Sequence, residues 1–239
     1  MKSLRVALLA GSSMLAIVMT QAQTVDEIVA KHIEAVGGKD KINSVKTVYT
    51  EYDMDAGGNA ASGISYIVNG KGFRNEVDFG GQKIIDANTE TTGWTINPMM
   101  GQSSATPMTP EQLNISKLRV WVGGPLYEYA AHGSKVELVG KENVGSVSAH
   151  KLKLTTKDGA EMLLYIDPAT YYIIKAVNKV NANGQDMEIS YTYSDFQKND
   201  YGLTTPKSSE LALPGFTLTI AVKKVEYNKD IDVKIFDQQ

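Results

Sequence analysis

The chain has 239 residues, of which 42% are hydrophobic and 21% charged, so it is not a disordered chain and it can form one sizeable core. The formal net charge of -3 argues against a nucleic-acid-binding protein, because such proteins carry a marked basic excess. The complete absence of cysteine excludes disulfides, cysteine-ligated zinc, iron–sulfur clusters and thiol catalysis.

The first 22 residues have the pattern of a secretory signal peptide. Lys2 and Arg5 form a positive start, residues 6–19 form a short apolar stretch, and Thr20–Ala22 places small residues at a cleavage site. The apolar stretch is shorter than the roughly 20 residues that a membrane-spanning helix needs. We therefore predict cleavage after Ala22 and a periplasmic mature protein that has no transmembrane segment and consists of one domain over residues 23–239.

The mature chain is expected to begin with an amphipathic helix. Thr24 and Glu27 form a capping box, and apolar residues then recur at helical spacing until Gly37–Gly38. After the helix, apolar and polar residues alternate, which is typical of antiparallel strands with one apolar face. Turn signals such as Gly80–Gly81 and Asn183–Gly184 separate the successive strands.

The strand pattern lapses between Pro98 and Gly133. Thr109–Gln112 carries a second helix-capping sequence, Gly123–Pro125 would end that helix, and we expect a shorter helix to follow it. The segment is rich in methionine, leucine and aromatic residues, so it must lie against other apolar surface. It therefore predicts a mostly helical lid over the sheet.

These elements together predict an α+β protein that is mostly antiparallel β. So many consecutive strands should curl into an incomplete, half β-barrel of about 10–11 strands, with an N-terminal helix and a helical lid. The apolar residues change parity near Lys223–Lys224, which indicates a β-bulge. Periodicity alone leaves open whether the interior is packed solid or hollow.

The chain contains no strong catalytic or metal-binding motif. His32, His132 and His150 lack the spacing of metal ligands, and there is no G-x-S-x-G sequence to expose a nucleophile. Paired carboxylates such as Glu76 and Asp78 have strand spacing and fit a solvated outer face. We therefore expect a protein that is not an enzyme and that needs neither a metal nor a cofactor.

The methionine-rich lid segment permits two interpretations. Methionine is unbranched and polarizable, so it adapts to irregular apolar ligands. One interpretation is an ordinary core beneath a lid, and the other is a lipid-accepting cavity with a mobile helical roof.

Several short motifs, in their order and spacing, resemble the LolA-like family of outer-membrane lipoprotein-sorting proteins. The resemblance includes the exported helix of residues 24–32, followed by Gly37–Lys41. Gly93–Pro98 is similar to the family's strand that ends in Trp-x-x-Asn-Pro before a helical lid. Leu164–Pro168 and Gly202–Pro206 stand at turns that recur in such sequences. The resemblance implies an incomplete antiparallel barrel, closed by helices, whose apolar interior receives acyl chains.

The resemblance also shows one departure. The lipoprotein carriers of this family have an arginine after the second strand that locks the lid by hydrogen bonds. The corresponding turn here, Val68–Gly72, contains no arginine. Arg74 lies beyond that turn, and the role is not transferred to it.

We therefore interpret the chain as a soluble, monomeric periplasmic carrier that holds acyl chains of a lipoprotein or another lipid without covalent bonds. The alternatives are an envelope hydrolase that uses the same pocket, and a module that binds an envelope protein partner through its apolar lid. The residues expected to form the cavity and lid are Phe73, Val77, Phe79, Trp94, Met99, Met100, Met108, Leu113, Leu118, Trp121 and Leu126.

Overall fold

A computed structural model describes residues 23–182 and 185–238 of the chain. The predicted signal peptide, residues 1–22, and the expected turn at Asn183–Gly184 lie outside the described residues. In the part that is described, no helix is both long and apolar enough to cross a membrane.

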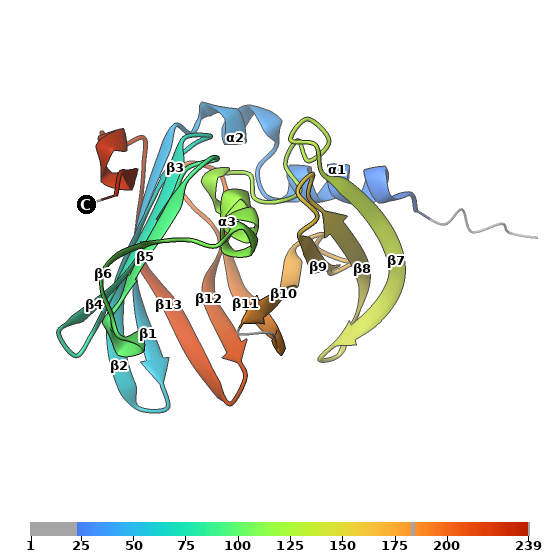
Figure 1. Ribbon diagram of the computed structural model, residues 1–239. Coiled ribbons are helices and arrows are strands. Elements are labelled where there is room, and N and C mark those ends of the chain that lie inside the picture. The colour runs from blue at the N-terminus through green and yellow to red at the C-terminus, as the bar shows by residue number, and fades with distance from the viewer. Residues whose placement is uncertain (1–22, 183–184, 239) are drawn as a thin grey trace, which may run out of the picture.

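The described chain forms one large sheet with a few short helices around it (Figure 1). The strands are β1 (Thr47–Ala56), β2 (Asn59–Val68), β3 (Gly72–Phe79), β4 (Gln82–Asn88), β5 (Gly93–Asn97), β6 (Gln102–Pro107), β7 (Lys135–Val144), β8 (Val147–Thr155), β9 (Glu161–Ile166), β10 (Ile173–Ala182), β11 (Gln185–Lys198), β12 (Thr204–Leu213) and β13 (Phe216–Tyr227). The α-helices are α1 (Val25–Ala35), α2 (Lys39–Ser44) and α3 (Pro110–Ser116). The 3-10 helices are η1 (Pro98–Met100), η2 (Lys117–Val120) and η3 (Val233–Phe236).

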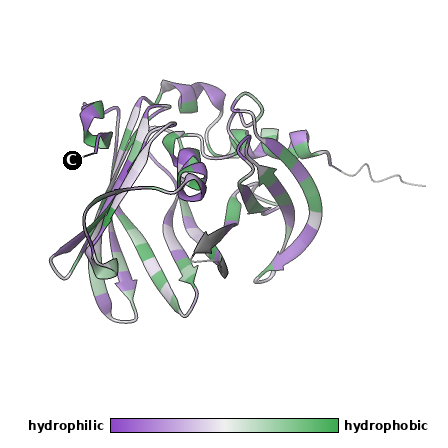
Figure 2. Ribbon diagram, in the orientation of Figure 1, coloured by the Kyte–Doolittle hydropathy of each residue, from purple (hydrophilic) through white to green (hydrophobic). Residues whose placement is uncertain are grey.

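The sheet has 13 strands in the order β6-β5-β4-β3-β2-β1-β13-β12-β11-β10-β9-β8-β7, and β1 pairs antiparallel with β13. The first and last strands in the chain therefore meet in the middle of the sheet, whereas β6 and β7 form its two edges. The sheet is curved, and its two edges do not pair with each other, so it forms an open half-barrel (Figure 1). Hydrophobic and hydrophilic residues alternate along β12 and β13, as expected of strands with one face turned inward (Figure 2).

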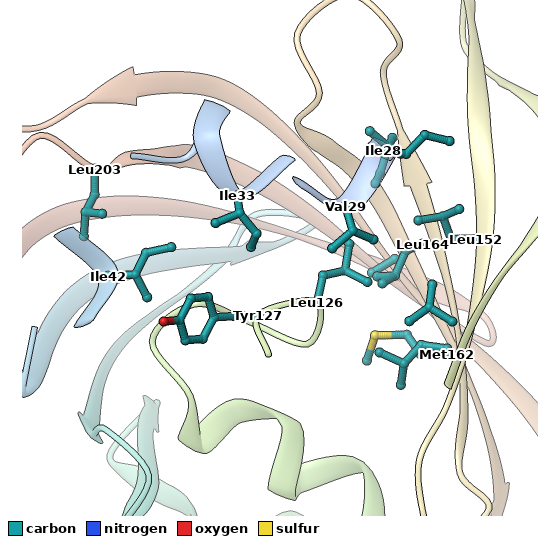
Figure 3. Close-up of a cluster of buried hydrophobic side chains, with 14 of the residues drawn as sticks. Ile28, Val29, Ile33, Ile42, Leu126, Tyr127, Leu152, Met162, Leu164 and Leu203 are labelled. Atoms are coloured by element: carbon teal, nitrogen blue, oxygen red, sulfur yellow. The ribbon is translucent and has the colours of Figure 1, made fainter. Parts of the chain in front are cut away.

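Helix α1 fills one half of the concave face. The predicted capping box between Thr24 and Glu27 is present and starts the helix. Ile28, Val29 and Ile33 are buried and pack with residues of β8 and β9 and with Leu126 (Figure 3). This half of the interior is therefore a solid core.

The half-barrel, the N-terminal helix and the Lys223–Lys224 bulge are confirmed. In the bulge, Glu51 pairs with Lys224 and Tyr52 with Val222, so Lys223 has no partner across β1. The strand number was underestimated, partly because β6 forms inside the segment that was expected to be helical. Helix α3 ends at Ser116 and η2 at Val120, and the further helix expected after Gly123–Pro125 is replaced by turns.

Candidate ligand cavity

The topology forces the segment between β6 and β7 across the open side of the half-barrel. These strands are consecutive in the chain but lie at opposite edges of the sheet. We call the connecting residues 108–134 the lid. The predicted capping box of Thr109 and Gln112 starts α3 within it. Figure 1 shows α3 in front of the concave face, between the two ends of the sheet.

The lid is tethered on both sides of the opening. On one side, the turn between β2 and β3 holds it: Gly70 N donates to the Val120 carbonyl at 2.9 Å, and Val122 N donates to Asn69 Oδ1 at 3.1 Å. On the other side, Lys117 Nζ forms an ion pair of 3.0 Å with Asp158, in the turn between β8 and β9. The lid therefore joins the two halves of the sheet.

Between the lid and the centre of the sheet lies a cavity of about 680 Å³. This volume falls in the range of pockets that bind small organic ligands. The roof includes Ile115, Leu118 and Pro125 of the lid, and the wall is formed by α1, β1–β3 and β9–β13. The interior is thus packed beneath α1 and hollow beneath α3.

Tyrosines form much of the wall. Tyr52, Tyr191 and Tyr193 line the cavity. Burial raises the pKa of Tyr52 to about 12 and also raises the pKa of Tyr191 and Tyr193, so all three phenols are neutral at physiological pH. Such rings offer a largely apolar surface with a few polar atoms.

Tyr52 lies against the sheet because its neighbour on β2 is a glycine. Gly63 pairs directly with Tyr52, and a Cβ at Gly63 would lie 2.1 Å from Cζ of the tyrosine ring. The ring therefore occupies the space of the missing side chain. Its hydroxyl donates a hydrogen bond to Asn75 Oδ1 on β3, which fixes its orientation.

The polar side chains that border the cavity include His32, Asn178 and Arg119. His32 Nδ1 lies 2.8 Å from the Tyr171 carbonyl, which can only accept, so Nδ1 carries the hydrogen. Burial lowers the pKa of His32 and favours the neutral ring. Asn178 is 8% exposed, and its Oδ1 finds no hydrogen-bond partner among the described residues.

Some of the predicted cavity residues lie on the cavity wall. Phe73 and Val77 face it from β3, and Leu118 faces it from the lid. Phe79 lies on the same strand, half-buried at its hairpin end and beyond the residues that line the cavity.

The structure places the other predicted residues elsewhere. Leu126 is 1% exposed and belongs to the core beneath α1, while Met99 and Met100 are 58% and 74% exposed on η1.

Met108 and Leu113 are half-buried against Gly93. A Cβ at Gly93 would lie 2.6 Å from Sδ of Met108 and 3.1 Å from Cδ1 of Leu113. These residues close the end of the lid near β5 and do not reach the cavity.

Neither tryptophan lines the cavity. Trp94 is buried, but its Nε1 donates to the Phe236 carbonyl on the opposite face of the sheet. Trp121 stacks on His132 with 4.0 Å between ring centroids and borders a separate small pocket at the side of the lid. The position of a tryptophan next to the lid in the sequence was therefore a poor guide to its position in space.

Sequence reasoning missed the tyrosine wall and Arg119. The signal for the wall was present, because Ile189, Tyr191 and Tyr193 share one parity along β11. Alternation identifies this face as inward but does not tell which strands lie beneath α1 and which lie beneath the lid. No periodic signal distinguishes Arg119 from the other polar residues of the lid segment.

Comparisons with known proteins show the fold. No protein-family model and no curated protein matches the sequence. A LolA superfamily protein from Nitrosomonas europaea is similar in structure, with a TM-score of 0.59 and 13% identity over 91% of this chain and 99% of that one. A DUF1329 family protein from Desulfovibrio piger has a TM-score of 0.57 and 15% identity over 90% of this chain and 98% of that one.

A third similar structure is a domain from Vibrio parahaemolyticus described as an outer-membrane lipoprotein-sorting protein. Its TM-score is 0.54, with 10% identity over 87% of this chain and 95% of that one. The likeness predicted from the sequence motifs is confirmed at the level of the fold: the chain is a LolA-like open half-barrel with a lid.

Proposed function

We propose that the protein is a soluble periplasmic carrier that binds acyl chains of a lipid or lipoprotein in the cavity beneath the lid. The observation that carries the proposal is the hollow of about 680 Å³ between an apolar roof and an aromatic wall. The LolA-like fold, which a lipoprotein-sorting domain shares, supports the same function.

Binding of this kind needs no covalent step. Apolar ligand surface that leaves water contributes about 25 cal/mol for each Å² that becomes buried. The tethers at Asn69, Gly70 and Asp158 keep the roof in place over the ligand. These tethers are a few hydrogen bonds and one ion pair, so α3 and η2 can move away from the cavity without breaking any pairing between strands.

A neutral probe tests this function without involving charge. We expect the methyl ester of dansyl-labelled lauric acid to bind the purified, delipidated protein, with an increase in dansyl fluorescence. Leu118→Asn puts an amide without a partner into the roof, which costs roughly 1–3 kcal/mol. Affinity for the ester should therefore fall about tenfold, or about 1.4 kcal/mol.

Met100→Asn is the matched control, because Met100 is 74% exposed and does not line the cavity. This variant should bind the ester like the wild type. Failure of the wild type to bind any acyl probe, or an equal loss in both variants, would contradict the carrier proposal. The hydrolase alternative predicts instead that the ester is cleaved and that His32→Gln abolishes the cleavage while the fold persists.

A further inference from the structure

The lid places one cation at the cavity. Arg119 lines it, and its guanidinium carbon lies 4.3 Å from the centroid of the Phe73 ring on the wall. Its Nη2 donates to Ser116 Oγ at 2.6 Å. These two contacts fix the guanidinium beside the cavity and leave most of its five N–H donors available.

The neighbouring lysine on η2 shows a different arrangement. Lys117 Nζ is paired with Asp158 at 3.0 Å and borders the small side pocket instead. Arg119, in contrast, has no carboxylate within ion-pair distance among the residues that the structure describes. One turn of 3-10 helix therefore directs one cation to a carboxylate and the other to the cavity.

The surroundings of Arg119 lack an opposing charge on the cavity wall. Among the described lining residues, none is an aspartate or a glutamate, and Arg119 is the one permanently charged side chain. Burial raises the pKa of Tyr52 and Tyr191, and the positive charge of Arg119 opposes that rise. The negative charge of Asp86 on β4 raises the pKa of the same two phenols, but Asp86 does not line the cavity.

We propose that the cavity takes an anionic amphiphile, whose acyl chain lies against the aromatic wall and whose carboxylate or phosphate head binds the guanidinium of Arg119. This inference rests on the proposed acyl-binding function and adds the charge of the ligand and the residue that recognises it. A guanidinium suits both heads because it can donate two parallel hydrogen bonds to a pair of oxygens.

Three probes with the same chain test the inference by calorimetry on the delipidated protein at pH 8: dodecanoate, dodecyl phosphate and dodecanol. We expect the wild type to bind at least one of the two anions about tenfold more tightly than the alcohol. Arg119→Gln should abolish this preference, so that the variant binds the two anions and dodecanol with affinities within about twofold of one another, whereas Arg119→Lys should keep part of the preference. A preference for dodecanoate points to a fatty acid, and one for dodecyl phosphate points to a phosphate-bearing lipid.

Lys83→Gln is the control, because it removes a positive charge from an exposed position of β4 that does not line the cavity. It should keep the preference for anions. If the wild type binds dodecanol as tightly as both anions, or if Arg119→Gln keeps the preference, the inference is wrong and the carrier function still stands. If none of the three probes binds, the carrier function itself fails.

Discussion

The indole Nε1 of Trp94 donates a hydrogen bond of 2.9 Å to the backbone carbonyl of Phe236, 142 residues further along the chain. Arg74 adds a second bond, from Nη1 to the carbonyl of Ile235 at 2.7 Å. Because Arg74 follows Phe73, which faces the cavity, it points to the opposite face of β3. The two bonds therefore hold η3 against the convex face of the sheet, as Figure 1 shows.

Trp94→Phe should weaken the fold without affecting the cavity. The variant keeps an aromatic ring and removes the indole N–H, so the Phe236 carbonyl loses a buried partner. We expect the free energy of unfolding, measured in urea, to fall by about 1–2 kcal/mol. Affinity for the dansyl-laurate ester should not change, and a selective loss of affinity with unchanged stability would place Trp94 in the binding site after all.

The inward and outward faces of single strands could be predicted from the sequence, but the register across the longer turns could not. Phe73 and Val77 were assigned correctly to the inner face, because alternation within β3 is clear. Trp94 was assigned to the cavity from its position before the lid. The Gly80–Gly81 hairpin fixes the register of Ala87 with Arg74, but the side of Trp94 depends on its register with Ala87, which the longer turn between β4 and β5 does not fix from sequence.

The division of the interior into a solid half and a hollow half was also beyond the sequence. The helical period shows that Ile28, Val29 and Ile33 must be buried, but not which strands they cover. Leu126 has the apolar character of a cavity residue and lies in the core, because the end of the lid turns beneath α1. Such choices follow from long-range packing, which single residues do not encode.

Gly63→Ala should displace the ring of Tyr52 and reshape the cavity. The added Cβ would lie 2.1 Å from the ring carbon Cζ. The Tyr52 ring must therefore leave its place over Gly63 and lose its hydrogen bond to Asn75. We expect a loss of about 1–3 kcal/mol in unfolding free energy, as for other overpacked sites. In the Tyr52→Ala background the same glycine substitution should cost little, and equal costs in both backgrounds would show that the ring is not the obstacle.

Two buried histidines predict a loss of stability in acid. Burial lowers the pKa of His32, and burial together with the charge of Lys141 lowers the pKa of His150, both from an ordinary value of 6.5. Well above that pH both rings are neutral in the folded and unfolded chains, so there they contribute nothing to the pH dependence. Below it the unfolded chain takes up protons first, so the free energy of unfolding should fall, by at most about 1.4 kcal/mol per pH unit for each ring.

Urea unfolding at a series of pH values from 7.5 to about 5 measures this dependence. The double variant with His32→Gln and His150→Gln should show a flatter profile than the wild type, and each single variant should lie between the two. A double variant whose stability falls as steeply as that of the wild type would assign the acid sensitivity to carboxylates instead.

Asn69→Ala should loosen the lid on one side only. The side-chain oxygen of Asn69 accepts from Val122 N at 3.1 Å, and its amide donates to the Val45 carbonyl at 3.3 Å, so this residue connects the lid to the segment between α2 and β1. The substitution removes both bonds and leaves Val122 N without its partner. Amide exchange should become faster over residues 117–126 and stay unchanged in the core strands β8 and β9.

Lys117→Gln, which releases the opposite tether to Asp158, provides the comparison, and the variant that combines both substitutions should exchange faster than either single variant. Unchanged exchange across the lid in the combined variant would mean that α3 is held by its apolar contacts and that these polar tethers do not limit access to the cavity.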